Sequence, residues 1–238
     1  MVVDAVLYNG ERDIFDLRYG ILKDVVDEFV VVEFGKTFSG KVKEAHPINL
    51  PKVSYHFFTQ VDFRKQMEFP PAFEMEFNQR EMIHQCLTHL KDEDIVFVGD
   101  VDEIWEPDKI ETGTKSRLRV YAYWLNHRSS EDFALGPVCM EYKILKHWGL
   151  NRLRTDTPLT ADLRGWHFTN MGGPEALRKK IEAYGHQEFN TLEIKENLVE
   201  RMMRSQDYIG RDFKMRKDES ELPSYLLQNK EQFKHLLL

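Results

Sequence analysis

The sequence predicts an α/β fold in which helices cover both faces of a mixed β-sheet, as an α/β/α sandwich. Two short runs, Phe29–Val32 and Ile95–Val98, are entirely apolar, which is typical of strands buried on both faces of a parallel sheet. Stretches with helical spacing of apolar residues alternate with these runs, and the second half of the chain is rich in longer strand-like segments. Binding sites of such folds lie at the carboxyl ends of the strands.

Strands and helices alternate at the start of the chain. A strand is expected over residues 1–8, and Asn9 then marks a turn. The helix expected over 14–22 has apolar residues at helical spacing, and the first apolar run follows it as the second strand. A third strand is expected over 53–58.

A longer helix is expected to begin at Pro70-Pro71, because proline is favoured in the first helical turn. Five apolar residues trace one face of it: Phe73, Phe77, Ile83, Leu87 and Leu90. Arg80 and Glu81 lie off this face. The apolar face is therefore expected to be buried, and the charged residues to be exposed.

The second half favours longer strands followed by helices. Segments 119–126 and 137–145 are rich in Tyr, Val and Ile with polar residues between them, which is typical of strands. The helical signals are Pro174, the capping pair Asn190 and Glu193, and an amphipathic segment over 223–238. We expect one domain over residues 1–238, because the sequence contains neither a repeat nor a linker.

The composition predicts an acidic globular chain. Its 238 residues include 33 Lys and Arg against 40 Asp and Glu, which gives a net charge of −7. This balance argues against nucleic-acid-binding and polybasic membrane-surface proteins, because both need a positive field to attract phosphates. No segment approaches the roughly 20 apolar residues needed to cross a bilayer. Cys86 and Cys139 are expected to be buried thiols in a reducing compartment, so a cytoplasmic location is expected.

An acidic cluster follows the second apolar run. Asp100, Asp102 and Glu103 leave this strand within four residues, and three such close charges repel unless a cation compensates them. Carboxylate oxygens select hard ions such as Mg²⁺ or Mn²⁺, which keep positions open for substrate phosphates. The alternative is that these are solvated charges of a loop.

Several longer motifs, in order, resemble glycosyltransferase family 17, which includes the β-1,4-mannosyl-glycoprotein β-1,4-N-acetylglucosaminyltransferases. The motifs are Phe29–Glu33, Lys36–Lys41, Asn78–Arg80, Asp100–Ile104 and Gly165–Gly173. The resemblance runs from about Val3 to His186. It implies a GT-A-like, Rossmann-type nucleotide-sugar fold and a metal-dependent, inverting transfer from a UDP-sugar, with UDP-GlcNAc as the expected donor, to a glycan hydroxyl. Residues 1–105 would then be the nucleotide-binding half and 106–238 the acceptor-binding half.

The resemblance also implies a Mn²⁺ or Mg²⁺ site. Asp102, with Asp100 and His167, would hold the ion, since the segment around His167 resembles the metal-binding histidine segment of other GT-A enzymes. His186 is the competing third ligand. Lys179 and Lys180 would meet the diphosphate. A hydrogen-bonded core histidine is the alternative for His167.

Other polar residues are candidates for binding the nucleotide: Asn9, Glu11, Glu33 and Lys36, which follow or end strands, and Arg80 in the helix after Pro71. The acceptor hydroxyl needs a carboxylate base, and Glu175 is the first candidate, with Glu141 and Asp162 as rivals. Glu175 lies in a first helical turn, where it also interacts favourably with the helix dipole.

Aromatic residues offer surfaces for stacking sugars, although core packing is the alternative for each of them: Tyr121, Tyr123, Trp124, Trp148 and Trp166. Two other functions stay open. A nucleotidyltransferase also uses paired carboxylates with Mg²⁺, and a nucleotide-sugar- or carbohydrate-binding protein would keep the pocket without turnover.

Overall fold

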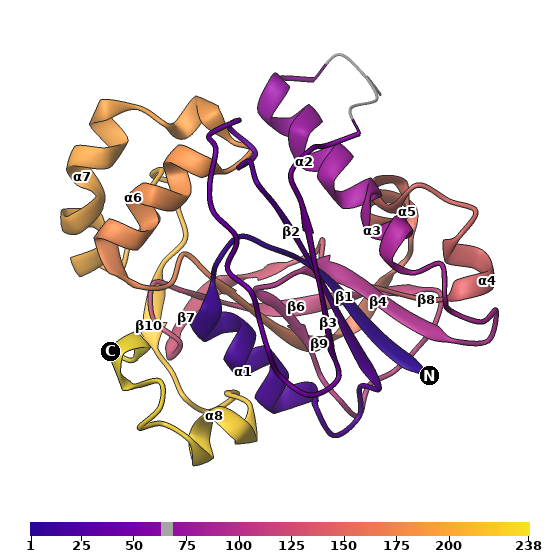
Figure 1. Ribbon diagram of the computed structural model, residues 1–238. Helices are drawn as coiled ribbons and strands as arrows, with labels where there is room; N and C mark the ends of the chain where they lie inside the picture. Colours follow the sequence, from indigo (N-terminus) through magenta and orange to yellow (C-terminus); the bar gives the residue numbers. More distant parts are fainter. Residues whose placement is uncertain (63–68) are drawn as a thin grey trace.

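A mixed ten-stranded sheet runs through the part of the chain that this computed structural model describes, residues 1–62 and 69–238 (Figure 1). Its strand order is β10-β7-β6-β8-β4-β1-β2-β3, with β9 paired to β5 and β6. The strands are β1 (Val2–Tyr8), β2 (Glu28–Phe34), β3 (Val53–Phe58), β4 (Ile95–Asp100), β5 (Glu103–Trp105), β6 (Thr114–Ala122), β7 (His127–Phe133), β8 (Val138–Glu141), β9 (Leu159–Thr169) and β10 (Met215–Lys217).

The strands β3, β2, β1 and β4 are parallel, and β2, β1 and β4 are almost entirely buried, whereas β3 at the edge is half-buried. Ala5 of β1 lies opposite Val30 of β2 and Val98 of β4. Successive side chains point to opposite faces, so Ala5 belongs to one core cluster and Val6 to the other. The apolar runs are therefore explained by burial on both faces.

Helices cover both faces, as predicted (Figure 1). The helices are α1 (Arg12–Leu22), α2 (Pro71–Glu81), α3 (Ile83–Cys86), α4 (Tyr142–Leu145), α5 (Leu150–Asp156), α6 (Gly173–Ala183), α7 (Leu192–Met203) and α8 (Ser224–Gln228). Helices α1 and α8 contribute to the core on one face, and α3, α4 and α5 to the core on the other. Helices α6 and α7 form a third core with Ala122 and Tyr123 at the end of β6. Cys86 and Cys139 are buried free thiols.

The predicted first three strands, the first helix and the strand before the acidic cluster are confirmed, but several boundaries in the second half were wrong. Strand β6 begins at Thr114 and ends at Ala122, because Tyr123 has a positive φ of 72°. The strand predicted over 137–145 ends at Glu141 and continues as α4. The amphipathic segment 223–238 contains only the five residues of α8 and a short 3₁₀ turn.

Two helix details also differ from the prediction. Thr191, and not Asn190, caps α7, since its side chain accepts a hydrogen bond from the backbone N of Ile194 at 3.3 Å. Helix α2 buries Arg80, although this residue was expected to be exposed, and it also buries Asn78 and Gln79. Phe73 and Phe77, expected in the core, are only half-buried.

Candidate functional site

A cavity of about 740 Å³ opens at the carboxyl ends of β1 and β4. The chain leaves β1 through α1 toward β2 on one side, whereas β4 lies on the other side of β1. Such a switch in strand order leaves a crevice between the two connections. Many of the polar residues lining it come from several elements or the loops after them: Asn9, Glu11, Glu76, Arg80, Asp100, Asp102, Glu103, Arg154, His167 and Lys180.

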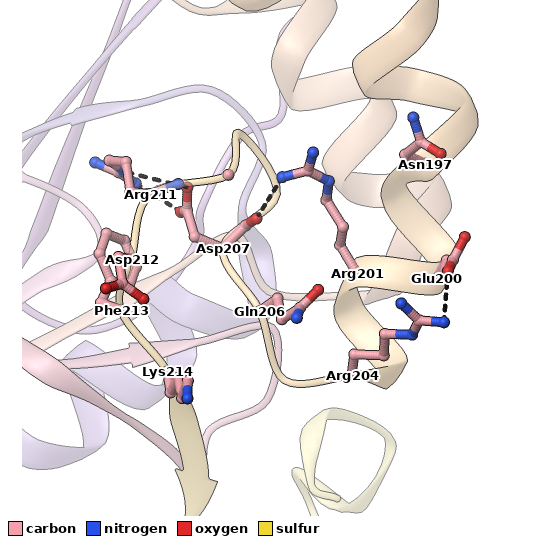
Figure 2. A pocket seen from close by; sticks show the side chains of 11 residues that line it. Asn197, Glu200, Arg201, Arg204, Gln206, Asp207, Arg211, Asp212, Phe213 and Lys214 are labelled. Atoms are coloured by element: carbon pink, nitrogen blue, oxygen red, sulfur yellow. Dashed lines mark hydrogen bonds and ion pairs between the residues drawn. The ribbon is translucent and has the colours of Figure 1, made fainter.

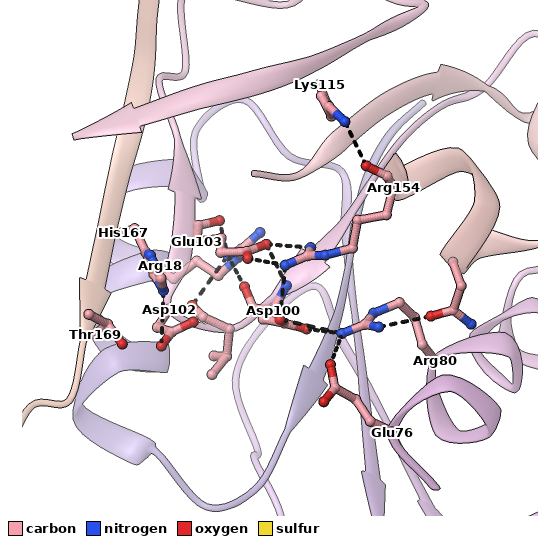
Figure 3. Close-up of polar contacts among 12 residues, drawn as sticks. Arg18, Glu76, Arg80, Asp100, Asp102, Glu103, Lys115, Arg154, His167 and Thr169 are labelled. Atoms are coloured by element: carbon pink, nitrogen blue, oxygen red, sulfur yellow. Dashed lines mark hydrogen bonds and ion pairs between the residues drawn. The ribbon is translucent and has the colours of Figure 1, made fainter. Parts of the chain in front are cut away.

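A buried arginine holds the acidic loop, residues 100–103, in place (Figure 3). Arg18 of α1 is fully buried, and its Nε and Nη2 atoms each donate to one carboxylate oxygen of Asp4 at 2.6 Å. Its Nη1 atom donates to three backbone carbonyl oxygens, those of Asp100, Val101 and Glu103, at 3.2, 3.2 and 2.7 Å. The backbone of the loop is therefore fixed from beneath, which leaves its carboxylates to face the cavity.

Asp102 meets His167 and Lys180 inside the cavity. Strand β5 pairs with β9 so that Glu103 lies opposite His167, and this register brings His167 beside the acidic loop. Oδ2 of Asp102 lies 3.2 Å from Nζ of Lys180 and 3.6 Å from Nε2 of His167. Burial alone would raise the pKa of Asp102, but Lys180 and then His167 lower it by more, so the pKa lies far below its usual range.

Asp100 and Glu103 contact arginines instead. Arg80 of α2 lies 3.1 Å from Oδ1 of Asp100, and Arg154 of α5 lies 3.2 Å from Oδ2 of the same carboxylate. Arg154 also contacts both oxygens of Glu103, one of them at 2.8 Å. Burial would raise the pKa of Asp100, but Arg80 and Arg154 lower it below its ordinary value. Burial keeps the pKa of Glu103 raised despite Arg154.

Two side chains of the cavity, those of Asp102 and His167, have the chemistry to ligate a divalent cation. Across residues 1–62 and 69–238, no group of three or more His, Cys, Asp or Glu side chains is placed to hold a metal ion. Asp102 and His167 do converge, and Nδ1 of His167 is buried with no hydrogen-bond partner in that part of the chain. One carboxylate and one imidazole are compatible with Mn²⁺, and phosphates commonly supply the remaining ligands.

Glu11 and Asn9 lie at the end of β1 and also line the cavity. Oε2 of Glu11 accepts a hydrogen bond from the backbone N of Asn9 at 2.7 Å. Burial raises the pKa of Glu11, and the Asn9 hydrogen bond and Lys180 only partly offset this.

Two of the candidate nucleotide ligands, Glu33 and Lys36, are not among the residues that line the cavity. Glu33 is fully buried, and its carboxylate contacts Lys43, Tyr55 and His46, the last through the backbone N at 2.8 Å and Nδ1 at 2.7 Å. The backbone oxygen of Lys36 accepts a hydrogen bond from Gln79 Nε2 at 2.9 Å. Glu33 therefore braces the segment after β2.

The other lysine and the candidate bases lie on the surface. Lys179 and Glu175 are exposed on α6. Glu141 pairs with Lys143, and Asp162 pairs with Arg164 at 2.8 Å. The carboxylates that face the cavity are those of Glu11, Glu76 and the acidic loop.

The aromatic residues at the cavity are mostly phenylalanines that the sequence did not single out for binding. Tyr121, Tyr123 and Trp166 are buried in the cores, and Trp124 packs beside Tyr123. Trp148 is exposed and lies under Arg152. His186 does line the cavity, with its Nδ1 2.8 Å from Glu188 Oε1 and its ring 4.7 Å from that of Phe73.

A smaller pocket of about 410 Å³ lies between α7 and the loop before β10 (Figure 2). Two of its arginines are ion-paired, Arg211 with Asp207 at 2.8 Å and Arg204 with Glu200 at 2.9 Å, whereas Arg201 donates to the backbone oxygen of Asp207 at 3.3 Å. The larger cavity, where charged side chains from several elements converge at strand ends, is the better candidate site.

Residues 1–117 match the family model described as glycosyltransferase family 17. The match supports membership of glycosyltransferase family 17. It agrees with the resemblance identified from the sequence motifs, and family 17 points to glycosyl transfer, with a sugar donor and an acceptor as substrates. No curated protein and no solved structure shows significant similarity to the chain.

The family 17 match covers only one side of the cavity. Asn9, Glu11, Arg80 and the acidic loop lie within the matched residues, whereas His167 and Lys180 lie beyond them. Among the helices of the described residues, none combines the length and apolar character that crossing a membrane requires.

Proposed function

We propose that this chain is a metal-dependent, inverting glycosyltransferase of GT-A-like architecture. It would transfer a sugar, GlcNAc in the first instance, from a UDP-sugar to a hydroxyl of a glycan acceptor. The observation that carries the proposal is the meeting of Asp102, His167 and Lys180 at the carboxyl ends of β1 and β4. These three side chains come from separate elements, and they combine an anion, an imidazole and a cation in one cavity.

Asp102 and His167 would hold the Mn²⁺ or Mg²⁺ ion. When bound, the ion neutralises the negative charge of the diphosphate. Asp100 has a different role in this proposal, because both of its oxygens contact arginines. It would orient Arg80 and Arg154 toward the anionic end of the donor.

Transfer is a single displacement at the anomeric carbon. The acceptor oxygen forms a bond to this carbon from the face opposite the diphosphate, and the bond from the carbon to the phosphate oxygen breaks, so UDP leaves with the electron pair. Lys180 stabilises the negative charge that develops on the departing phosphate. Glu11 receives the proton of the acceptor hydroxyl, since it faces the cavity and its recorded side-chain hydrogen bond is to a backbone amide.

The test is UDP release from UDP-GlcNAc with Mn²⁺ and a panel of mannose- or glucose-terminated acceptors. Asp102→Asn should reduce turnover at least about 100-fold and weaken Mn²⁺ binding measured by calorimetry. Asp156→Asn, which removes an exposed carboxylate of α5, is the matched control and should change neither quantity. Equal turnover in Asp102→Asn and the parent protein would refute the proposed role of Asp102.

A further inference from the structure

One wall of the cavity is apolar and phenylalanine-rich. We call it the phenylalanine wall, and it consists of Phe34, Phe38, Phe69, Phe73, Phe77 and Leu135. Phe73 and Phe77 lie one turn apart on α2, whereas Phe69 precedes the helix, and the ring contacts of Phe77 join the three into one aromatic stripe. The ring of Phe77 lies 5.1 Å from that of Phe69 and 6.3 Å from that of Phe73.

Helix α2 is turned so that its polar residues are buried and its aromatic stripe faces the cavity. Asn78, Gln79 and Arg80 are buried, and each is held by hydrogen bonds, such as that from Gln79 Nε2 to the backbone oxygen of Lys36. Phe73 and Phe77 remain half-buried, and Phe69 is 38% exposed. A helix on a folded domain normally buries its apolar face. Exposing this stripe therefore costs free energy unless a ligand covers it.

The wall is larger and less polar than the surface on which one sugar ring stacks. A sugar ring can stack on one aromatic ring, but the wall side chains carry no hydrogen-bond donor or acceptor, so sugar hydroxyls pressed against the rest of the wall would lose water without gaining a partner. A nucleobase has two faces and covers two rings at most, whereas four phenylalanine rings of the wall and Leu135 are not fully buried, and Phe34 lies buried behind them. The occupant that fits is an extended apolar group.

We propose that the acceptor of this enzyme carries an apolar group beside its reacting hydroxyl, and that this group lies on the phenylalanine wall. The inference rests on the proposed function and names the acceptor class: a sugar with an alkyl or other extended apolar aglycone. One molecule would then place its hydroxyl among the charged residues of the cavity and its aglycone against α2. Leu135, which is 43% exposed in the loop after β7, adds an apolar side chain to the lining of the same cavity.

The experiment compares methyl and octyl glycosides of the same sugar as acceptors, below the micelle concentration of the octyl compound. The parent protein should have a KM for the octyl glycoside about tenfold or more below that for the methyl glycoside, because each buried methylene favours binding. Phe69→Ser and Leu135→Ser should reduce this ratio to less than about threefold and leave the KM for the donor unchanged. Met203→Ser removes an 80% exposed side chain of α7 outside the cavity and should keep the parent ratio.

Equal KM values for the two glycosides, or a ratio that the two wall variants leave unchanged, would overturn the inference. A loss of the ratio in Met203→Ser as large as in Phe69→Ser would also overturn it, because the preference would then be unspecific. Binding of the octyl glycoside can also be measured by calorimetry, which does not depend on turnover. If no donor is ever transferred but the glycoside still binds through Phe69, the proposed function fails while the apolar site stands.

Discussion

The Nζ atom of Lys180 lies 3.2 Å from Oδ2 of Asp102, although 78 residues separate them in the chain. The contact joins α6 to the end of β4 and closes the charged side of the cavity. Burial would lower the pKa of Lys180, but Asp102 and then Glu11 raise it by more. Lys180 therefore keeps its positive charge inside the cavity, where an anionic leaving group needs it.

Lys180→Ala should reduce kcat about 100-fold, as expected for the loss of one preorganised donor to developing negative charge. Lys179→Ala is the matched control, because Lys179 is the neighbouring residue of α6 and is exposed. UDP release under saturating donor and acceptor measures both variants. A similar loss in the two variants would show that general positive charge on α6, and not the position of Lys180, supports the reaction.

Arg18→Lys should lower the free energy of unfolding by about 3 kcal/mol, because a lysine cannot reproduce the two contacts to Asp4 together with the three backbone carbonyl contacts. Turnover should fall as well, since the acidic loop loses its support. Chemical denaturation and UDP release provide the two readouts. Arg12→Lys changes an exposed arginine of the same helix and should alter neither. An unchanged denaturation midpoint in Arg18→Lys would contradict the anchoring role.

The lowered pKa of Glu33 predicts that part of the stability of the fold is lost in acid. Burial would raise its pKa, but Lys43, Tyr55 and His46 lower it by more, so the folded-state pKa lies below the unfolded value of about 4.3. A depressed pKa contributes stability that is present above the unfolded value and is lost as pH falls through the folded value. Glu33→Gln should therefore lower the free energy of unfolding by about 2 kcal/mol at pH 7 and by less near pH 3.

The measurement for Glu33 is denaturant unfolding of the parent and the variant between pH 7 and pH 3. Glu231→Gln, which changes a 93% exposed carboxylate, should follow the parent at every pH. A difference between Glu33→Gln and the parent that grows toward acid would contradict the direction of the pKa shift.

The parallel half of the fold could be predicted from the sequence because burial on both faces leaves a local signature. The run Ile95–Val98 is apolar without interruption, and it ends where the acidic loop begins, so the place of Asp100 and Asp102 at a strand end could also be predicted. The different partners of Asp100 and Asp102 could not be predicted from the sequence. Arg80 and Arg154 reach Asp100 from α2 and α5, and no local pattern encodes this pairing.

Two other features depended on tertiary contacts. Arg18 looks like an ordinary helical charge, because its partner Asp4 lies in a strand 14 residues earlier and the carbonyl groups that it binds lie more than 80 residues later. Helix α2 was predicted with its phenylalanines in the core, since helical periodicity identifies an apolar face without showing whether protein or ligand covers it.

Glu11→Gln should separate the two candidate catalytic bases. Both Glu11 and Glu175 lie at helix starts, but Glu11 lines the cavity beside Lys180, whereas Glu175 is exposed on the first turn of α6. Proton transfer in the transition state contributes about 10²- to 10⁴-fold, so Glu11→Gln should lower kcat by at least about 100-fold. The amide still fills the same space and can accept the hydrogen bond from the backbone N of Asn9, so the KM for the donor and the affinity for Mn²⁺ should stay the same.

Glu175→Gln should keep kcat within about twofold, because near-surface helix-dipole interactions affect stability and not proton transfer. The opposite pattern, with kcat lost in Glu175→Gln alone, would mean that α6 moves its first turn into the cavity when substrates bind, and the base would then be Glu175.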